Sequence, residues 1–297
     1  MDNKRSEKEK VAVVIGCSSG IGFETSLLLA RKGFYTYATM RNLNKSQKIK
    51  DIAEKESLPL KILQLDVTDD KSVKDAIREI TYESSRIDVL VNNAGFDIMG
   101  AVEDLSIDDY KSQFETNFFG VIRVTKEVIP IMRNHGGGNI VNISSVGGRI
   151  GIPLNTAYIS SKFALEGLSE SMRYELEPFG IDVILIEPGV VKTNFFENAD
   201  IVINNNNTTS NQPSLYSHFS KKLYEGFEPM LNSSSSSVSS DVAEMIYQAI
   251  ESSNHEIRYL VGKDAVSIIN TRQNLSDKEF ENWIKESIFQ QKGFIHQ

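Results

Sequence analysis

The chain has 297 residues, of which 40% are hydrophobic and 24% are charged, so it can bury a large core. Its net charge of -8 argues against nonspecific binding to nucleic acid, which requires a positive field. The single cysteine, Cys17, excludes an internal disulfide, and four scattered histidines give no metal-ligand spacing, so we expect no metal site.

The sequence begins with a charged tail, residues 1–9, that precedes no apolar run of signal-peptide length. No stretch approaches the roughly 20 apolar residues that a membrane-spanning helix requires. We therefore expect a cytoplasmic protein that is neither secreted nor inserted in a membrane.

Short apolar runs rich in β-branched residues alternate with longer stretches of helical periodicity. The runs lie at residues 11–15, 34–39, 61–65, 88–92, 139–144, 182–187 and 256–262. Strands that alternate with helices predict a parallel sheet covered on both faces. Because crossovers between parallel strands are right-handed, we predict an α/β fold with a Rossmann-like, doubly wound sheet of about seven strands.

Helical patterns support this prediction. Residues 20–32 and 70–84 each present an apolar stripe, and either Thr68 or Asp69 is placed to cap the second helix.

The regular alternation stops after the sixth run. Residues 200–213 and 232–240 are rich in asparagine and serine, a composition typical of mobile loops. We interpret residues 195–240 as a mobile substrate lid within one domain that spans residues 1–297.

The first strand is followed by the stretch "GCSSGIG", which opens the first helix. In this context the N–H groups and the dipole of the helix N-terminus face an anion. Gly16 is expected to make the turn, Gly20 to let a phosphate approach, and Gly22 to let helix and strand pack closely. Ser18 and Ser19 add hydroxyl donors. A tight connection without a ligand is the alternative.

Arg41 indicates which cofactor is bound. A free 2'-hydroxyl usually meets an acid about 20 residues beyond the glycine loop, whereas a 2'-phosphate suits an arginine. The sequence there is "ATMRNLN", with Arg41 and no acid, and a guanidinium group binds phosphate bidentately. We predict that NADP(H) is preferred over NAD(H), with a solvated surface arginine as the alternative.

Further motifs occur in order along the chain: "LDVTD" at 65–69, "NNAG" at 92–95, "NISS" at 142–145, "YISSK" at 158–162 and "EPG" at 187–189. With the glycine loop, they resemble the single-domain branch of the short-chain dehydrogenase/reductase family, across about residues 9–195. "GCSSGIG" and "YATMRNL" also resemble the group that holds estradiol 17-beta-dehydrogenase and related retinol dehydrogenases.

The resemblance implies a catalytic set of Asn117, Ser145, Tyr158 and Lys162. Tyr158 and Lys162 stand four residues apart in a segment with helical periodicity, so they share a helix face. For a tyrosine to act as an acid/base near neutral pH, its pKa must fall by about three units, which requires about 4 kcal/mol. One cation at ~4 Å supplies about that much at an effective dielectric near 20. Lys162, helped by the oxidised nicotinamide, is thus expected to make Tyr158 the acid/base.

Two members of this set have competing interpretations. Ser145 lies at the carboxyl edge of the sheet and would hold the substrate oxygen. Ser144 is its competitor, and Ser145 is preferred because the family's serine lies thirteen residues before the tyrosine. Asn117 would bind a water that links Lys162 to solvent, and an asparagine at a helix irregularity is the alternative.

The resemblance also implies further cofactor contacts. Asp66 would bind the adenine amino group, or else mark a helix start, and Thr193 would lie near the nicotinamide carboxamide. Asn92 would line the adenosine side of the cofactor with Ala94 and Gly95, and a structural role in bonding neighbouring strands is the alternative for Asn92. The other residues expected at the cofactor are Ile21, Val67, Asn93, Ala94, Gly95, Pro188, Gly189 and Val191, with Tyr158 and Lys162.

An apolar substrate pocket is expected beside these residues. Its expected members are Ser145, Tyr158, Phe195, Phe196, His218, Phe219 and Tyr224, of which the last five fit lid packing equally well. The predicted reaction is NADP(H)-dependent hydride transfer to or from a carbonyl or alcohol, such as a ketone, an aldehyde, or a steroid- or retinoid-like compound.

Two other functions compete with this prediction: a non-catalytic NADP(H)-binding sensor and, with less support, an epimerase or dehydratase. Because the family often forms dimers or tetramers, we expect a homo-oligomer through the helices around residues 106–133 and 155–179.

Overall fold

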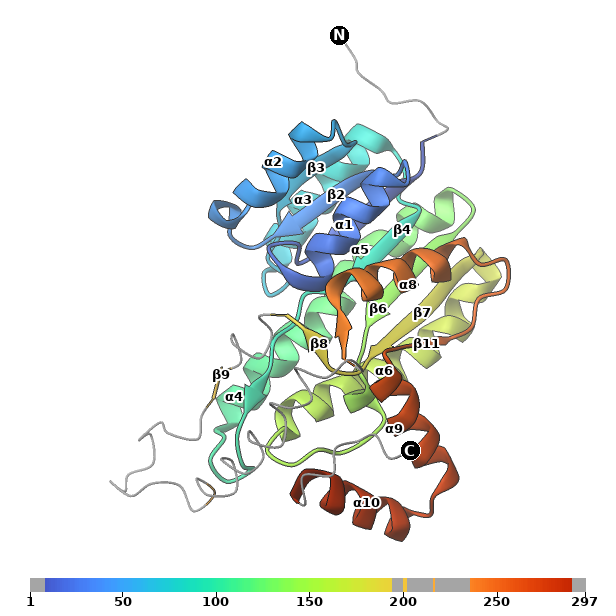
Figure 1. Ribbon diagram of the computed structural model, residues 1–297. Coiled ribbons are helices and arrows are strands. Elements are labelled where there is room, and N and C mark those ends of the chain that lie inside the picture. Colours follow the sequence, from blue (N-terminus) through green and yellow to red (C-terminus); the bar gives the residue numbers. More distant parts are fainter. Residues whose placement is uncertain (1–8, 194–199, 202–215, 217–235, 290–297) are drawn as a thin grey trace.

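The computed structural model describes residues 9–193, 200–201, 216 and 236–289. Seven parallel strands form one central sheet with helices on both faces, which confirms the predicted Rossmann-like architecture (Figure 1). The strand order across the sheet is β3-β2-β1-β4-β6-β7-β11. These strands are β1 (Val11–Ile15), β2 (Tyr35–Met40), β3 (Leu60–Gln64), β4 (Val89–Asn92), β6 (Gly138–Ile143), β7 (Ile181–Pro188) and β11 (Arg258–Val261).

Helices connect the strands and cover the sheet, and the last two helices of the described chain follow β11. The helices are α1 (Gly20–Arg31), α2 (Gln47–Lys55), α3 (Asp70–Ser84), α4 (Ile107–Phe114), α5 (Gly120–Asn134), α6 (Thr156–Leu176), α8 (Ser239–Glu251), α9 (Lys263–Asn274) and α10 (Asp277–Phe289). The short strands are β5 (Ile98–Met99), β8 (Val191–Lys192), β9 (Asp200–Ile201) and β10 (Ser237–Val238).

The strand order reverses at β1. This strand pairs with β2 on one side and with β4 on the other, so the chain leaves β1 in one direction and returns to its other edge. In open parallel sheets, such a reversal opens a crevice at the carboxyl ends of the strands, where ligands bind. The glycine-rich loop follows β1 directly and therefore lies at this crevice.

The core consists of two apolar layers, one on each face of the sheet. All five residues of β1 are buried, and they alternate between the layers. Ala12 and Val14 pack with residues of α1 and α8, whereas Val13 and Ile15 pack with residues of α3, α5 and α6. This burial on both faces explains why the strands are continuous apolar runs.

The expected elements differ from the observed ones mainly at their ends. β1 and α3 have the predicted bounds, whereas β2 begins and ends one residue later than the run at 34–39. Asp69, not Thr68, caps α3, because its carboxylate accepts hydrogen bonds from the N–H groups of Lys71 and Ser72.

The lid predicted at 195–240 lies almost wholly outside the described residues and stays a prediction. In the described part of the chain, no helix combines the length and the apolar character that crossing a membrane would require.

Candidate active site

The glycine-rich loop lies against the segment that follows β4. Gly16 has a φ of +83°, and a Cβ atom there would lie 2.9 Å from the Cα atom of Ala94. The side-chain amide of Asn93 donates hydrogen bonds of 3.0 Å to the carbonyl oxygens of Ile15 and Gly16. The "NNAG" segment therefore fixes the path of the loop.

The other two glycines of the loop have different surroundings. A Cβ atom on Gly22 would clash with the carbonyl group of Gly16, so glycine allows close packing here, as expected. Gly20 has a φ of +63°, and its nearest neighbour is Thr193, at 3.7 Å from the position of an added Cβ. α1 begins at Gly20, and its N-cap residue, Ser19, makes no side-chain capping bond. The first N–H groups of this helix are suited to bind an external anion.

The remaining loop residues are more enclosed. Cys17 is buried and its thiol donates to the carbonyl oxygen of Val14, at 3.1 Å. Burial raises the pKa of Cys17 to about 12, so the thiol stays protonated and is a poor nucleophile. Ser18 is half-buried, and Ile21 packs against the core.

Arg41 and Asp66 follow two neighbouring strands at the same edge of the sheet. Arg41 comes directly after β2, and its side chain is exposed. Asp66 follows β3 closely, and its Oδ1 atom accepts hydrogen bonds from the backbone N–H group of Thr68, at 3.0 Å, and from its hydroxyl, at 2.8 Å. Asp66 thus braces the turn into α3. Val67 and Ala94 meet nearby, since both line one small pocket.

A buried polar ladder, made of Thr125, Asn92, Asn142 and Ser169, ties the strands to the helices around the site. The amide of Asn92 on β4 donates to Asn142 on β6, at 2.9 Å, and to Thr125 on α5, at 3.1 Å. The amide of Asn142 in turn donates to Ser169 on α6, at 2.9 Å. Asn92 therefore bonds neighbouring strands, the alternative given for it, and its contact with the adenosine side of the cofactor stays a prediction.

Ser145 and Tyr158 come together at the carboxyl end of β6. Ser145 follows the strand, accepts a hydrogen bond of 3.0 Å from the N–H group of Gly147, and bonds to the side chain of Tyr158. Ser144 points elsewhere, because its hydroxyl bonds to the buried carboxylate of Glu166. The geometry favours Ser145 over Ser144 as the partner of the tyrosine.

Lys162 lies one turn after Tyr158 on α6 and is almost wholly buried, with 7% of its surface exposed. Its ammonium group donates a hydrogen bond of 2.7 Å to the carbonyl oxygen of Ile143 and lies 5.5 Å from the ring centre of Tyr158. Burial lowers the pKa of Lys162 to about 8, against the opposing charges of Glu166 and Asp97. The lysine is thus held at Ile143, which is the last residue of β6 and lies two residues before Ser145.

The pKa of Tyr158 shifts in the direction opposite to the sequence argument. Burial raises it most, the negative charge of Asp97 raises it further, and the bond to Ser145 lowers it. In the protein alone, these two effects exceed any stabilisation of the phenolate by Lys162. Neither the burial of Tyr158 nor its proximity to Asp97 follows from the four-residue spacing of Tyr158 and Lys162.

Asn117 lies in η2 (Glu115–Phe119), a π-helical turn between α4 and α5. Its side chain accepts from the N–H group of Phe96, at 3.1 Å, and donates to the carbonyl oxygen of Phe96, at 3.0 Å. It also donates to Ser161, at 3.2 Å, whose hydroxyl bonds to the carbonyl oxygen of Tyr158. Asn117 is therefore at a helix irregularity and also contacts the catalytic helix. A Cβ atom on Gly95 would approach its Oδ1 atom to 3.2 Å.

The "EPG" segment is held by a residue that the sequence argument did not identify. Asp264, at the start of α9, is buried and accepts a hydrogen bond of 2.6 Å from the N–H group of Val190. Gly189 leaves no room for a Cβ atom beside this carboxylate. Asp264 thus shapes the turn from Pro188 at the end of β7 to Val191 at the start of β8, just before Thr193.

Two expected substrate contacts, Phe195 and His218, lie outside the described residues, as do Phe196, Phe219 and Tyr224. Asp97 and Asn155 were not identified as site residues either, although both are buried beside the catalytic helix. An available signal for Asp97 was a lone acid in the run "FDIMGAV", five residues after the strand that ends at Asn92.

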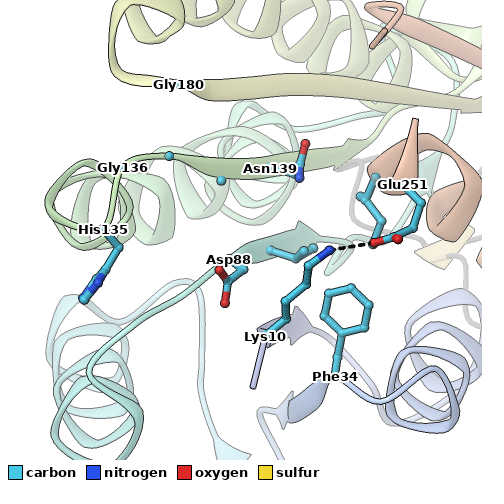
Figure 2. A pocket seen from close by; sticks show the side chains of 12 residues that line it. Lys10, Phe34, Asp88, His135, Gly136, Asn139, Gly180 and Glu251 are labelled. Atoms are coloured by element: carbon cyan, nitrogen blue, oxygen red, sulfur yellow. Dashed lines mark hydrogen bonds and ion pairs between the residues drawn. The ribbon is translucent and has the colours of Figure 1, made fainter. Parts of the chain in front are cut away.

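A hollow at the opposite ends of the strands is lined by none of these motif residues. Figure 2 shows Lys10, Phe34, Asp88 and Gly180 around it, with a bond of 3.0 Å between Lys10 and Glu251. These residues precede β1, β2, β4 and β7, so the hollow lies at the amino ends of the strands. Ligands of parallel sheets bind at the carboxyl ends, which favours the edge beside the glycine loop as the active site.

Comparisons with known proteins agree with this geometry. The family model of the short chain dehydrogenase matches residues 10–202. The uncharacterized oxidoreductase YusZ of Bacillus subtilis is 37% identical, over 95% of this chain and 99% of that protein. Human 17-beta-hydroxysteroid dehydrogenase type 1 is 33% identical, over 92% of this chain and 83% of that protein.

Solved structures share the fold. A short-chain dehydrogenase from Streptomyces avermitilis superposes with a TM-score of 0.79 and 30% identity, covering 95% of this chain and 98% of that chain. ElxO with NADP bound has a TM-score of 0.69 and 25% identity, covering 87% of this chain and 99% of that chain. Since the family model covers more than half of the sequence, the chain belongs to the short-chain dehydrogenase/reductase family and is an oxidoreductase that acts on CH–OH or C=O groups.

Proposed function

We propose that the protein transfers a hydride between NADP(H) and the carbonyl or alcohol carbon of an apolar substrate, with Tyr158 as the acid/base. The meeting of Ser145, Tyr158 and Lys162 carries this proposal. Ser145 bonds to Tyr158, and Lys162, on the same helix, bonds to the last residue of the strand that leads to Ser145.

The residues of the glycine loop fit a dinucleotide. A Cβ atom on Gly16 or Gly22 would strike the protein itself, whereas one on Gly20 would only make van der Waals contact with Thr193, at 3.7 Å. The start of α1 supplies backbone donors for a diphosphate. Arg41, exposed after β2 and with no acid beside it in the sequence, supports a 2'-phosphate and hence NADP(H) over NAD(H).

The protein's side chains divide the rest of the reaction among them. When bound, the reduced cofactor supplies a hydride to the carbonyl carbon. Tyr158 donates its phenolic proton to the carbonyl oxygen, which becomes a hydroxyl, and Ser145 holds that oxygen by a hydrogen bond. Lys162, whose pKa is about 8, is suited to hold the ribose hydroxyls and to return a proton to Tyr158. Asn117 positions α6 through Ser161 and is proposed to hold a water on the proton path.

The substrate we propose is an apolar carbonyl compound or alcohol, with steroid-like and retinoid-like molecules as the leading candidates. Human 17-beta-hydroxysteroid dehydrogenase type 1, which aligns over most of the chain, supports this class.

The decisive experiment is a screen for NADPH oxidation over aldehydes, ketones and sterols, with the Tyr158→Phe variant as the blank. We expect this variant to lose about 100-fold or more in kcat/KM, the usual contribution of general acid catalysis. Tyr174→Phe is the matched control, because Tyr174 lies on the same helix and is 75% exposed. If Tyr158→Phe kept near wild-type turnover of a verified substrate, the proposed role would be wrong.

A further inference from the structure

Asp97 is a buried acid beside the catalytic pair. It lies between the "NNAG" segment and β5, in an apolar run, and only 1% of its surface is exposed. Its charge acts on both Tyr158 and Lys162. Burial raises the pKa of Asp97 to about 7, which shows how weakly its surroundings stabilise the carboxylate.

Asn155 is its hydrogen-bond partner. Asn155 precedes α6, three residues before Tyr158, and its side-chain amide donates a hydrogen bond of 3.1 Å to Oδ2 of Asp97. The segments that carry the two side chains are joined by a bond of 2.8 Å from the N–H group of Gly100 to the carbonyl oxygen of Leu154. The relative position of Asp97 and Asn155 is therefore fixed by the backbone.

Each of these side chains keeps one unsatisfied acceptor. Oδ1 of Asp97 and Oδ1 of Asn155 are buried, and neither has a hydrogen-bond partner within the part of the chain that the structure describes. A buried acceptor without a partner is unfavourable, and a buried carboxylate without a paired cation more so. A hydroxyl group carries one donor, whereas an ammonium group carries three donors and a positive charge.

We propose that Asp97 and Asn155 form a subsite that binds a protonated amine of the substrate, close to the carbon that accepts or gives the hydride. The substrate class is then an amino ketone or the corresponding amino alcohol with an apolar remainder. The proposed place of the amine is near the reacting carbon, because Asn155, which bonds to Asp97, precedes Tyr158 by three residues at the start of α6. This inference rests on the proposed hydride transfer.

The test compares three long-chain ketones that differ only at the carbon next to the carbonyl: unsubstituted, with a hydroxyl group, and with an amino group. For the wild-type protein, we expect kcat/KM with NADPH to be about 10- to 100-fold higher for the amino ketone than for the plain ketone, the usual effect of a hydrogen bond to a charged group. Most of the difference should appear in KM, because the contact is made in the ground state.

The variant Asp97→Asn keeps the shape of the side chain and removes its charge, and we expect it to lose most of this preference. The measured quantity is the ratio of the two kcat/KM values, so a general effect on Tyr158 cancels. Asp75→Asn, the same change at a partly exposed acid on α3, should keep the wild-type ratio.

Each outcome decides the matter. Equal kcat/KM values for the amino and plain ketones in the wild type would overturn the subsite, whether or not the variant folds. So would a preference that Asp97→Asn retains, or a preference for the hydroxy ketone. Turnover of the plain ketone that is lost in Tyr158→Phe tests the proposed function alone. If the protein reduces the plain ketone but does not prefer the amino ketone, only the subsite is refuted. Turnover of none of the three would overturn the subsite alone, because the proposed function also covers steroid-like and retinoid-like substrates and is decided by the wider screen.

Discussion

The ammonium group of Lys162 bonds to the carbonyl oxygen of Ile143 at 2.7 Å, which joins the first half of α6 to the end of β6. The backbone carbonyl of the strand that leads to Ser145 therefore positions the lysine, while Tyr158, one turn away on the helix, bonds to Ser145. Strand and helix hold the three side chains as one unit.

Lys162→Met removes the charge and the bond to Ile143 while keeping a long apolar side chain. We expect kcat/KM for NADPH-dependent reduction to fall by about 100-fold or more, because the proton supply to Tyr158 and the proposed ribose contact are both lost. Lys126→Met, at an exposed position on α5, is the control. Activity within a few-fold of wild type in Lys162→Met would remove the lysine from the mechanism.

Arg41→Ala tests the choice of cofactor. The ratio of NADPH to NADH affinity, measured by fluorescence titration, should fall by about 10- to 100-fold, because a hydrogen-bonded charge pair with the 2'-phosphate is lost. Lys45→Ala, a neighbouring exposed cation, should leave the ratio nearly unchanged. An unchanged ratio in Arg41→Ala would mean that the arginine is a surface residue without this role.

Gly16→Ala and Gly33→Ala separate backbone strain from steric clash. Both glycines have a positive φ, +83° and +89°, but only Gly16 has a neighbour, Ala94, within 3 Å of an added Cβ atom. Urea unfolding should show a loss of about 1 kcal/mol for Gly33→Ala and clearly more for Gly16→Ala. NADPH binding should weaken in Gly16→Ala and stay unchanged in Gly33→Ala. Equal losses in stability would show that the loop can move away from Ala94.

Asp264→Ala leaves the N–H group of Val190 without its buried acceptor. We expect the free energy of unfolding to fall by about 1–3 kcal/mol and the KM for NADPH to rise, because the turn after β7 loses its support. Asp264→Asn retains an acceptor oxygen and should recover most of the stability. If both variants behaved alike, the carboxylate charge, and not the hydrogen bond, would be what matters.

Asp97 also predicts how stability depends on pH. Its pKa is about 7 in the folded protein, against 3.8 ordinarily, so the folded state binds its proton more tightly than the unfolded state. The resulting stabilisation is complete below about pH 4 and is lost as the pH rises through about 7. Relative to wild type, Asp97→Asn should therefore gain up to about 4 kcal/mol between pH 4 and pH 8. A constant difference across this range, measured by urea unfolding, would contradict the shifted pKa.

The sequence predicts the sheet well because its strands are buried on both faces. β1 matches the run "VAVVI" residue for residue, since every position must be apolar. The order of its motifs also predicts which side chains meet at the carboxyl edge, and Ser145, Tyr158 and Lys162 do so.

Other features depend on contacts that no local pattern contains. Asp264 reaches Val190 across 74 positions of the chain, so neither stretch alone predicts the bond. The raised pKa of Tyr158 has the same origin, because it results mostly from burial in the folded protein and then from Asp97, which is distant in sequence. The choice between Thr68 and Asp69 as a cap depends on backbone angles that a spacing rule does not determine.

The polar ladder of Thr125, Asn92, Asn142 and Ser169 has a consequence for redesign of this protein. Its four members are joined by hydrogen bonds and are buried, so exchanging one of them for an apolar residue leaves polar groups of its neighbours without a partner. Replacing all four together by well-packed apolar side chains should be tolerated better than most single changes. Variants of this protein should therefore either keep all four ladder residues or replace all four together.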